Sequence, residues 1–173
     1  MCALAALAEF PPLITRLFET REHEPSGVYR VSVCKNGAWR HVTLDDRFPC
    51  AGPDSGPLFS HSHGDELWVL LLEKCYAKLH GSYKAIEAGC PAEGMMDLTG
   101  APGAYIGFAE EAVAAELADG AFWRKLVQWD RGGTLMACGT PGVDEMTKSR
   151  GGAQPAGGLV PGHAYSLISC AEL

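Results

Sequence analysis

The segment 65–81, DELWVLLLEKCYAKLHG, constrains the fold more than any other part of the chain. Its apolar side chains recur at steps of three and four residues, which is the spacing of one face of an α-helix. Gly81 follows the last of them and offers a C-terminal stop. The sequence therefore predicts a central helix over 65–81, with the stripe that carries Trp68, Leu72 and Tyr76 in the core.

Strand-like segments lie on both sides of this helix. GVYRVSVC (27–34) alternates in polarity and is rich in β-branched residues, as a half-buried strand is. The Asn36-Gly37 pair predicts a tight hairpin turn, with the returning strand over 38–46. Towards the end of the chain we expect a buried strand over 133–139 and a last strand over 163–170.

Three further segments have helical character. Residues 2–9 are strong helix formers that precede two prolines, and 13–19 predicts another helical turn or two. A longer helix is expected over 108–120, continuing after Gly120 into 121–130. Glycine, proline and polar residues mark 140–161 as a long loop. This order of helices and strands indicates one mixed α+β domain.

Composition and charge exclude several classes of function. The net charge is −7 and the basic residues are scattered, which argues against nucleic-acid binding. No window approaches the roughly 20 apolar residues that span a bilayer. The seven cysteines form no C-x-x-C pair, and the N-terminus lacks the basic flank of a signal peptide. We therefore expect free thiols and an intracellular, cytoplasmic location.

Two polar clusters admit more than one interpretation. His61-Ser62-His63, close to Asp65 and Glu66, could suggest a metal site, but further ligands at suitable spacing are not evident. A polar loop that leads into the central helix is the favoured interpretation. Asp45-Asp46 could serve acid–base chemistry or a calcium site, but a turn with a salt bridge to a nearby basic side chain is favoured.

The sequence GHAYSL at 162–167 contains the most suggestive histidine. By itself His163 is more typical of a satisfied strand histidine than of a catalyst. Two features favour a functional role: Gly162 permits a close approach of a ligand or backbone, and the longest loop of the chain comes immediately before it. An unperturbed histidine exchanges protons near neutral pH, so His163 is a candidate general base.

Several segments become informative when they are taken together and in order. They are GVYRVSVCKNGAWRHVTLDDRFPC (27–50), ELWVLLLEKCYAKLHGSY (66–83), EGMMDLTG (93–100), GTLMACG (133–139) and GLVPGHAYSL (158–167). The set resembles the catalytic core of the calpains, papain-like cysteine endopeptidases that depend on calcium, and it covers essentially the whole chain. The resemblance implies a papain-like α+β core, with a remnant of the first, helical subdomain over 1–20 and the β-rich second subdomain over 27–173.

The resemblance also implies roles for four residues. His163 matches the histidine of a Cys-His-Asn triad, in which a cysteine thiolate attacks the peptide carbonyl and an asparagine orients the imidazole. Gly162 and Gly89 match glycines that line the substrate cleft. Glu66 matches an acidic ligand of a calcium site.

The chain departs from the family pattern at both ends. The apolar run ALAALAE follows Met1-Cys2 directly, so the family's nucleophile and oxyanion-hole glutamine would fall before Met1. Cys2 lies four residues beyond the nucleophile position, a displacement of about 6 Å along a helix, which argues against substitution. The family's asparagine would fall after Leu173.

We therefore expect a partial calpain catalytic domain, truncated at both ends, that carries only the general-base histidine and does not cleave peptides alone. Its partners would be protein or peptide substrates or other calpain domains. The alternative is a pseudo-peptidase module that keeps the calpain fold to bind peptides or proteins.

Overall fold

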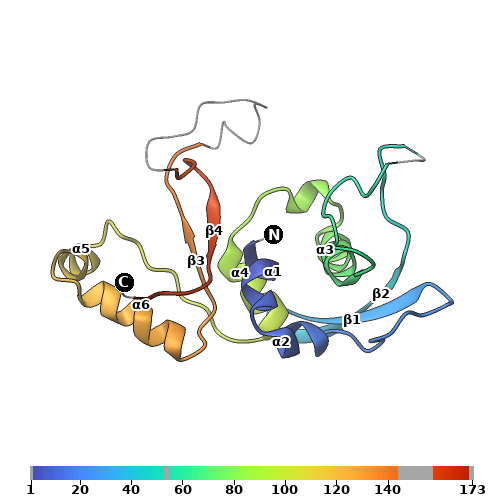
Figure 1. Cartoon of the computed structure of the whole chain (residues 1–173), viewed down its shortest axis with the longest axis horizontal. Coiled ribbons are helices and arrows are strands. Elements are labelled where there is room, and N and C mark those ends of the chain that lie inside the picture. Colours follow the sequence, from blue (N-terminus) through green and yellow to red (C-terminus); the bar gives the residue numbers. More distant parts are fainter. Residues whose placement is uncertain (1, 53–54, 144–157, 172–173) are drawn as a thin grey trace. The chain divides into compact units, whose positions relative to one another are not determined.

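The computed structural model describes residues 2–52, 55–143 and 158–171 (Figure 1). Over these residues it contains six α-helices and two small antiparallel sheets, which confirms the mixed α+β class. The chain divides into two compact units. We call Phe10–Pro102 the continuous unit, and Met1–Glu9 together with Gly103–Leu173 the discontinuous unit.

The predicted hairpin forms the sheet of the continuous unit. Strand β1 (Val28–Lys35) pairs with β2 (Ala38–Asp45) along its whole length, from Val28 opposite Asp45 to Lys35 opposite Ala38. Both residues of the turn have positive φ, 54° at Asn36 and 74° at Gly37. A two-residue turn with this geometry matches the natural twist of the strands, which explains why the Asn-Gly pair predicted it correctly.

The central helix packs against this hairpin. Helix α3 (Trp68–His80) contacts both strands, and Leu72 and Cys75 on its inner face are fully buried. Removing a side chain such as that of Leu72 from water contributes about 1.5–3 kcal/mol. The helix begins three residues later than the predicted 65, and it ends as expected before Gly81, whose φ is 92°.

Two short helices after α3 were not predicted. They are the 3₁₀ helix η1 (Lys84–Ile86) and α4 (Pro91–Thr99), which contacts β1. Gly94 in the middle of α4 weakens its helical pattern. Pro91 at the start of the helix and Gly100 just after its end are nevertheless residue types that mark the two ends of a helix. Helix α2 (Pro11–Thr15) opens on two prolines, which are tolerated in a first turn.

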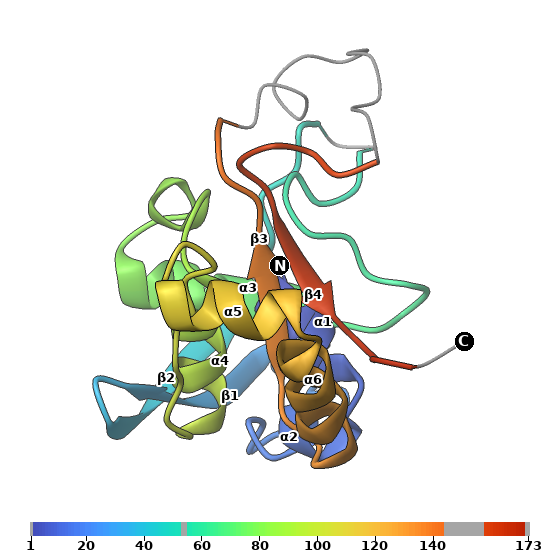
Figure 2. The same cartoon turned by 90° about the vertical axis from the view of Figure 1, so that its left-hand side faces the viewer.

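The discontinuous unit joins the first helix to the last strands. Strand β3 (Met136–Gly139) pairs with β4 (Ala164–Leu167), and the two lie side by side in Figure 2. Helix α1 (Cys2–Ala8) packs on this ribbon and buries Leu4 and Leu7. Both expected strands are therefore present, although each is shorter than the predicted range.

The expectation of one helix running through Gly120 is wrong. The chain forms two helices, α5 (Glu111–Ala118) and α6 (Ala121–Arg131), which contact each other. Gly120 has a φ of 76°, a left-handed conformation that ends the first helix. Asp119 then accepts a hydrogen bond from the amide of Ala121 at 2.7 Å and so helps to start the second.

Some predictions reach beyond what the structure describes. Most of the loop expected over 140–161 lies outside the described residues. The subdomain layout, with a remnant over 1–20 and a second subdomain over 27–173, stays a prediction. Within the described ranges, no helix is both long enough and apolar enough to cross a membrane.

Candidate functional site around His163

The backbone of His163 is fixed to the residues that follow β3. His163 lies between Gly162 and the first residue of β4, and its amide donates a hydrogen bond to Oγ1 of Thr140 at 3.0 Å. In return, the amide of Thr140 donates to the carbonyl oxygen of His163 at 2.9 Å. The amide of Gly162 donates to the carbonyl of Pro141 at 3.1 Å. These bonds extend the β3–β4 pairing and hold the histidine at its end.

The imidazole of His163 has an aromatic neighbour in the same unit. The rings of His163 and Tyr165 are 5.0 Å apart with an interplanar angle of 70°, an edge-to-face arrangement. The Tyr165 hydroxyl accepts a hydrogen bond from the amide of Val160 at 2.7 Å, and the Thr140 hydroxyl lies 2.5 Å from the carbonyl of Val160. Val160 therefore connects the two side chains that flank His163. This network orders the segment that leads into β4.

Cys2 lies in the same unit as His163, at the start of α1. Its thiol donates a hydrogen bond to the carbonyl oxygen of Ala164 at 3.0 Å, and the hydroxyl of Ser166 donates to the carbonyl of Cys2 at 2.9 Å. A backbone carbonyl accepts a hydrogen bond but does not remove a proton, so this contact does not generate a thiolate. In this geometry Cys2 ties α1 to β4.

Gly89 and Glu66 belong to the continuous unit, whereas His163 and Gly162 belong to the discontinuous unit. Gly89 is exposed and lies between η1 and α4, and a Cβ built there would meet no atom within 4 Å. Local packing therefore does not require glycine at position 89. Its role as a cleft residue stays a prediction, as does that of Gly162, whose positive φ of 65° does favour glycine.

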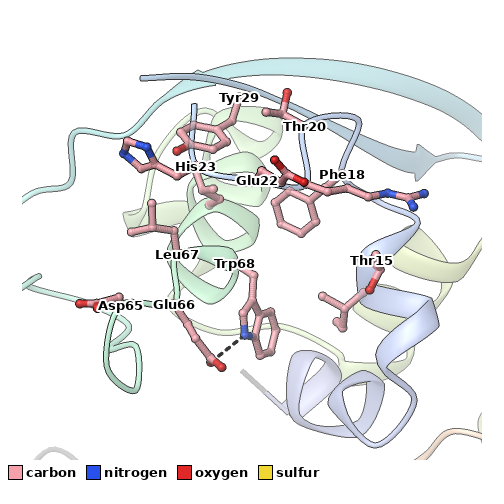
Figure 3. Close-up of a pocket in the computed structure, with 13 residues that line it drawn as sticks. Thr15, Phe18, Thr20, Glu22, His23, Tyr29, Asp65, Glu66, Leu67 and Trp68 are labelled. Carbon is pink, nitrogen blue, oxygen red and sulfur yellow. Dashed lines mark hydrogen bonds between the residues drawn. The ribbon is translucent and has the colours of Figure 1, made fainter. Parts of the chain in front are cut away.

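Glu66 lies at the rim of a cavity of about 340 Å³ within the continuous unit. Figure 3 shows its carboxylate beside the indole of Trp68, whose Nε1–H donates to Oε2 of Glu66 at 3.1 Å. The cavity walls come from α2 and the segment after it, from β1 and from the start of α3. They include the aromatic side chains Phe18, Tyr29 and Trp68 and the carboxylates of Glu22, Asp65 and Glu66.

The described residues place no group of three acidic ligands around Glu66. Calcium takes six to eight oxygen ligands, which come from carboxylates, backbone and amide carbonyls and water. Among the described residues, Glu66 is not part of any group of three histidine, cysteine or acidic ligands close enough to hold one ion. One oxygen of Glu66 is also engaged by Trp68. A calcium ion at Glu66 would need further ligands.

The two polar clusters noted in the sequence behave as ordinary surface features. His61 and His63 are exposed and lie outside the helices and strands, in agreement with a polar loop. Asp45 forms the expected salt bridge, with Nζ of Lys74 at 2.7 Å. This hydrogen bond and a second one from the amide of Arg47 hold the pKa of Asp45 below its ordinary value.

Comparison with known proteins is consistent with this architecture. The sequence profile described as "Calpain family cysteine protease" matches residues 1–173. The maize (Zea mays) calpain-type cysteine protease DEK1 is 35% identical over 173 residues, all of this chain but 8% of that protein. The chicken (Gallus gallus) calpain-2 catalytic subunit is 32% identical over 178 residues, and human (Homo sapiens) calpain-14 is 31% identical over 170.

The chain belongs to the calpain family of cysteine proteases. It covers 24% of the length of the chicken calpain-2 catalytic subunit and 23% of human calpain-14, so it corresponds to a small part of these relatives.

Sequence reasoning missed Thr140, which fixes the backbone of His163. No local signal marks this residue, because it follows β3 in a stretch rich in glycine and proline. Its contact with His163 joins residues 23 positions apart and depends on the register of β3 and β4.

Proposed function

We propose that this chain is part of a calcium-dependent, calpain-type cysteine endopeptidase domain and supplies the general base, His163. The observation that carries the proposal is the backbone anchoring of His163 at the start of β4, in a chain that matches the calpain family over its whole length. A rigid backbone limits where the imidazole can lie, and general-base catalysis depends on such positioning.

In this chemistry the imidazole of His163 removes the proton of a cysteine thiol. The resulting thiolate attacks the peptide carbonyl, and the imidazolium then gives the proton to the leaving amine. Gly162 and Gly89 would line the path of the substrate backbone. Protein or peptide chains would be the substrates, as the family suggests.

We further propose that this 173-residue chain does not hydrolyse peptides by itself. The support is the contact of Cys2, whose thiol donates to the carbonyl of Ala164 at 3.0 Å. Cys2 is engaged in holding α1 to β4. A nucleophile displaced by about 1 Å from its productive position already lowers the rate of catalysis by about a hundredfold. The nucleophile and the orienting asparagine would be supplied by residues outside this chain.

Calcium dependence rests on the family resemblance, with Glu66 as one proposed ligand. Because Glu66 has no cluster of acidic partners among the described residues, we expect the isolated chain to bind calcium weakly at most. Isothermal titration with calcium measures this directly. A site of micromolar affinity in the isolated chain would contradict the expectation.

The test of the general base uses the natural full-length polypeptide that carries this chain, with His163→Ala and His61→Ala as matched variants. His61 is exposed in a polar loop and serves as the control. We expect His163→Ala to lower calcium-stimulated cleavage of a fluorogenic peptide by at least about a thousandfold, as removal of a triad member does. The His61 variant should remain active.

Two outcomes would contradict these proposals. Retained cleavage in His163→Ala would remove His163 from the mechanism. An epoxysuccinyl thiol probe that labels Cys2 of the 173-residue chain, with labelling lost in His163→Ala, would show that the isolated chain is competent. A full-length polypeptide that binds peptides without cleaving them would instead support the pseudo-peptidase alternative.

A further inference from the structure

A group of three potential metal ligands lies in the continuous unit. One donor atom from each of His80, Glu93 and Asp97 falls within 4.8 Å of the other two. His80 is the last residue of α3, and Glu93 and Asp97 lie four residues apart on α4. Residues at this spacing share one face of a helix, so both carboxylates face the end of α3.

His80 has a polar atom that the rest of the described structure leaves unsatisfied. Its Nε2 is buried and has no hydrogen-bond partner among the described residues. A buried polar group without a partner destabilises the folded state by about 1–3 kcal/mol. The ring is held in place by Tyr76, whose ring centroid is 4.5 Å away. A ligand that accepts a nitrogen lone pair would relieve this cost.

The two carboxylates already neutralise one cation, the ammonium of Lys35. Its Nζ lies 2.7 Å from Oε1 of Glu93 and 2.7 Å from Oδ2 of Asp97. The hydroxyl of Tyr76 also donates to Oδ2 of Asp97, at 2.8 Å. The side chain of Asp97 is only 7% exposed, so its charge needs a compensating cation.

The charges favour exchange of this ammonium for a divalent ion. Lys35 leaves one uncompensated negative charge on the pair of carboxylates, whereas a divalent ion would balance both. Lys35 is the last residue of β1, next to the exposed turn, and its side chain is 19% exposed. Its flexible stem can therefore move towards solvent without disturbing the core.

The donor set selects the kind of metal. One imidazole nitrogen and two carboxylates suit zinc, which binds three protein ligands and a water molecule in many sites. Calcium and magnesium prefer sites made of oxygen alone. The cluster is also separate from Glu66, the residue proposed for calcium.

We propose that His80, Glu93 and Asp97 form a binding site for Zn²⁺ or a similar divalent transition-metal ion, which Lys35 opposes as an internal competitor. The metal would connect the end of α3 to α4, two helices that flank the β1–β2 hairpin. This site is independent of the proposed peptidase chemistry, and its test uses no measurement of proteolysis.

The test titrates Zn²⁺ into the 173-residue chain by calorimetry, with the folding of each variant checked by circular dichroism. We expect binding of one ion per chain that His80→Asn weakens by at least about tenfold. His61→Asn, on an exposed loop, should bind as the wild type does. Lys35→Met should bind several times more tightly, because it removes the competing cation.

Cobalt provides a second readout that separates this site from the cysteines. Co²⁺ bound by His80 and the carboxylates should absorb in the visible range without the intense sulfur-to-metal charge-transfer band of thiolate ligands. Binding that is unchanged in His80→Asn, or a thiolate band on Co²⁺ addition, would overturn the proposal. A Lys35→Met variant that binds Zn²⁺ no more tightly than the wild type would also overturn the proposal. This outcome does not depend on the folding of the His80→Asn variant.

Discussion

Thr140 and His163 hold each other through a reciprocal pair of backbone-directed hydrogen bonds. The His163 amide donates to the Thr140 side chain at 3.0 Å, and the Thr140 amide donates to the His163 carbonyl at 2.9 Å. The threonine hydroxyl thus takes the place of a backbone carbonyl as the acceptor for the His163 amide, one residue beyond the last β3–β4 pair. The Thr140 hydroxyl is therefore one of the groups that fix the backbone of the candidate general base.

Replacing Thr140 with valine should destabilise the chain. Valine keeps the shape of threonine but leaves the amide of His163 without its acceptor, so we expect a loss of about 1–3 kcal/mol in the free energy of unfolding. Urea unfolding followed by circular dichroism measures the change. Thr134→Val is the control, because Thr134 is exposed, and it should change stability by less than about 0.5 kcal/mol. Equal effects from the two variants would contradict the role of Thr140.

Stability should fall in acid partly through Asp45. Lys74 and the Arg47 amide hold the folded-state pKa of Asp45 below its ordinary value of 3.8, so the unfolded state binds the proton more tightly. The contribution of this group is complete above the unfolded value and is lost as the pH falls through the folded value. Lys74→Met should therefore flatten the dependence of the unfolding free energy on pH below about pH 5.

Lys78→Met is the matched control for this measurement. Lys78 lies on the same helix, but its ammonium donates to the carbonyl of Thr43, which does not titrate. Removing the Lys78 ammonium should leave the pH dependence of the unfolding free energy unchanged. A slope that changes equally in both variants would mean that the Asp45 pair does not cause the effect.

Two glycines with positive φ should respond differently to alanine. Gly81 has a φ of 92° and open space around it, so Gly81→Ala should cost about 1–2 kcal/mol from backbone strain alone. Gly100 has a φ of 70°, and a Cβ there would lie 3.0 Å from Cζ2 of Trp39. Gly100→Ala adds this crowding to the same strain and should lower the urea midpoint further. Equal effects would indicate that Trp39 moves away without penalty, and a smaller effect at Gly100 would contradict the prediction.

The cysteines should differ in their reactivity. Burial raises the pKa of Cys75 to about 12, although the charge of Lys78 acts in the opposite direction. Because the thiolate is the reactive form, Cys75 should resist alkylation in the folded chain, whereas the exposed Cys50, Cys90 and Cys138 should react. A brief pulse of iodoacetamide followed by peptide mass spectrometry tests this. All of them should react in urea, and early labelling of Cys75 in the folded chain would contradict its burial.

Much of the continuous unit could be predicted because its signals are local. The Asn36-Gly37 turn and the periodic apolar positions around Leu72 each specify an element through neighbours only a few residues away. Helix α4 was missed because Gly94 interrupts its pattern and because its support is distant. Lys35 on β1 bonds both of its acidic residues. Such tertiary contacts override weak helix propensity.

The discontinuous unit was harder to predict because its contacts join residues that are far apart in the sequence. The GHAYSL motif pointed to His163 through a family resemblance, but its anchor Thr140 depends on how two short strands pair. The helix break at Gly120 was missed because the flanking residues favour a helix on both sides. Asp119 and the left-handed Gly120 separate the two helices. The sequence shows that a glycine at position 120 permits the left-handed conformation, but it does not show whether the chain adopts that conformation there.

The joining of α1 to β4 has a consequence for biosynthesis. Cys2 bonds Ala164, 162 positions later, so α1 cannot bury Leu4 and Leu7 against the β3–β4 ribbon until β4 has been synthesised. The continuous unit has all its residues available much earlier and can fold first, because domains generally fold as units during synthesis. Between the synthesis of α1 and that of β4, the nascent chain therefore exposes the apolar residues of α1, the kind of segment that chaperones bind.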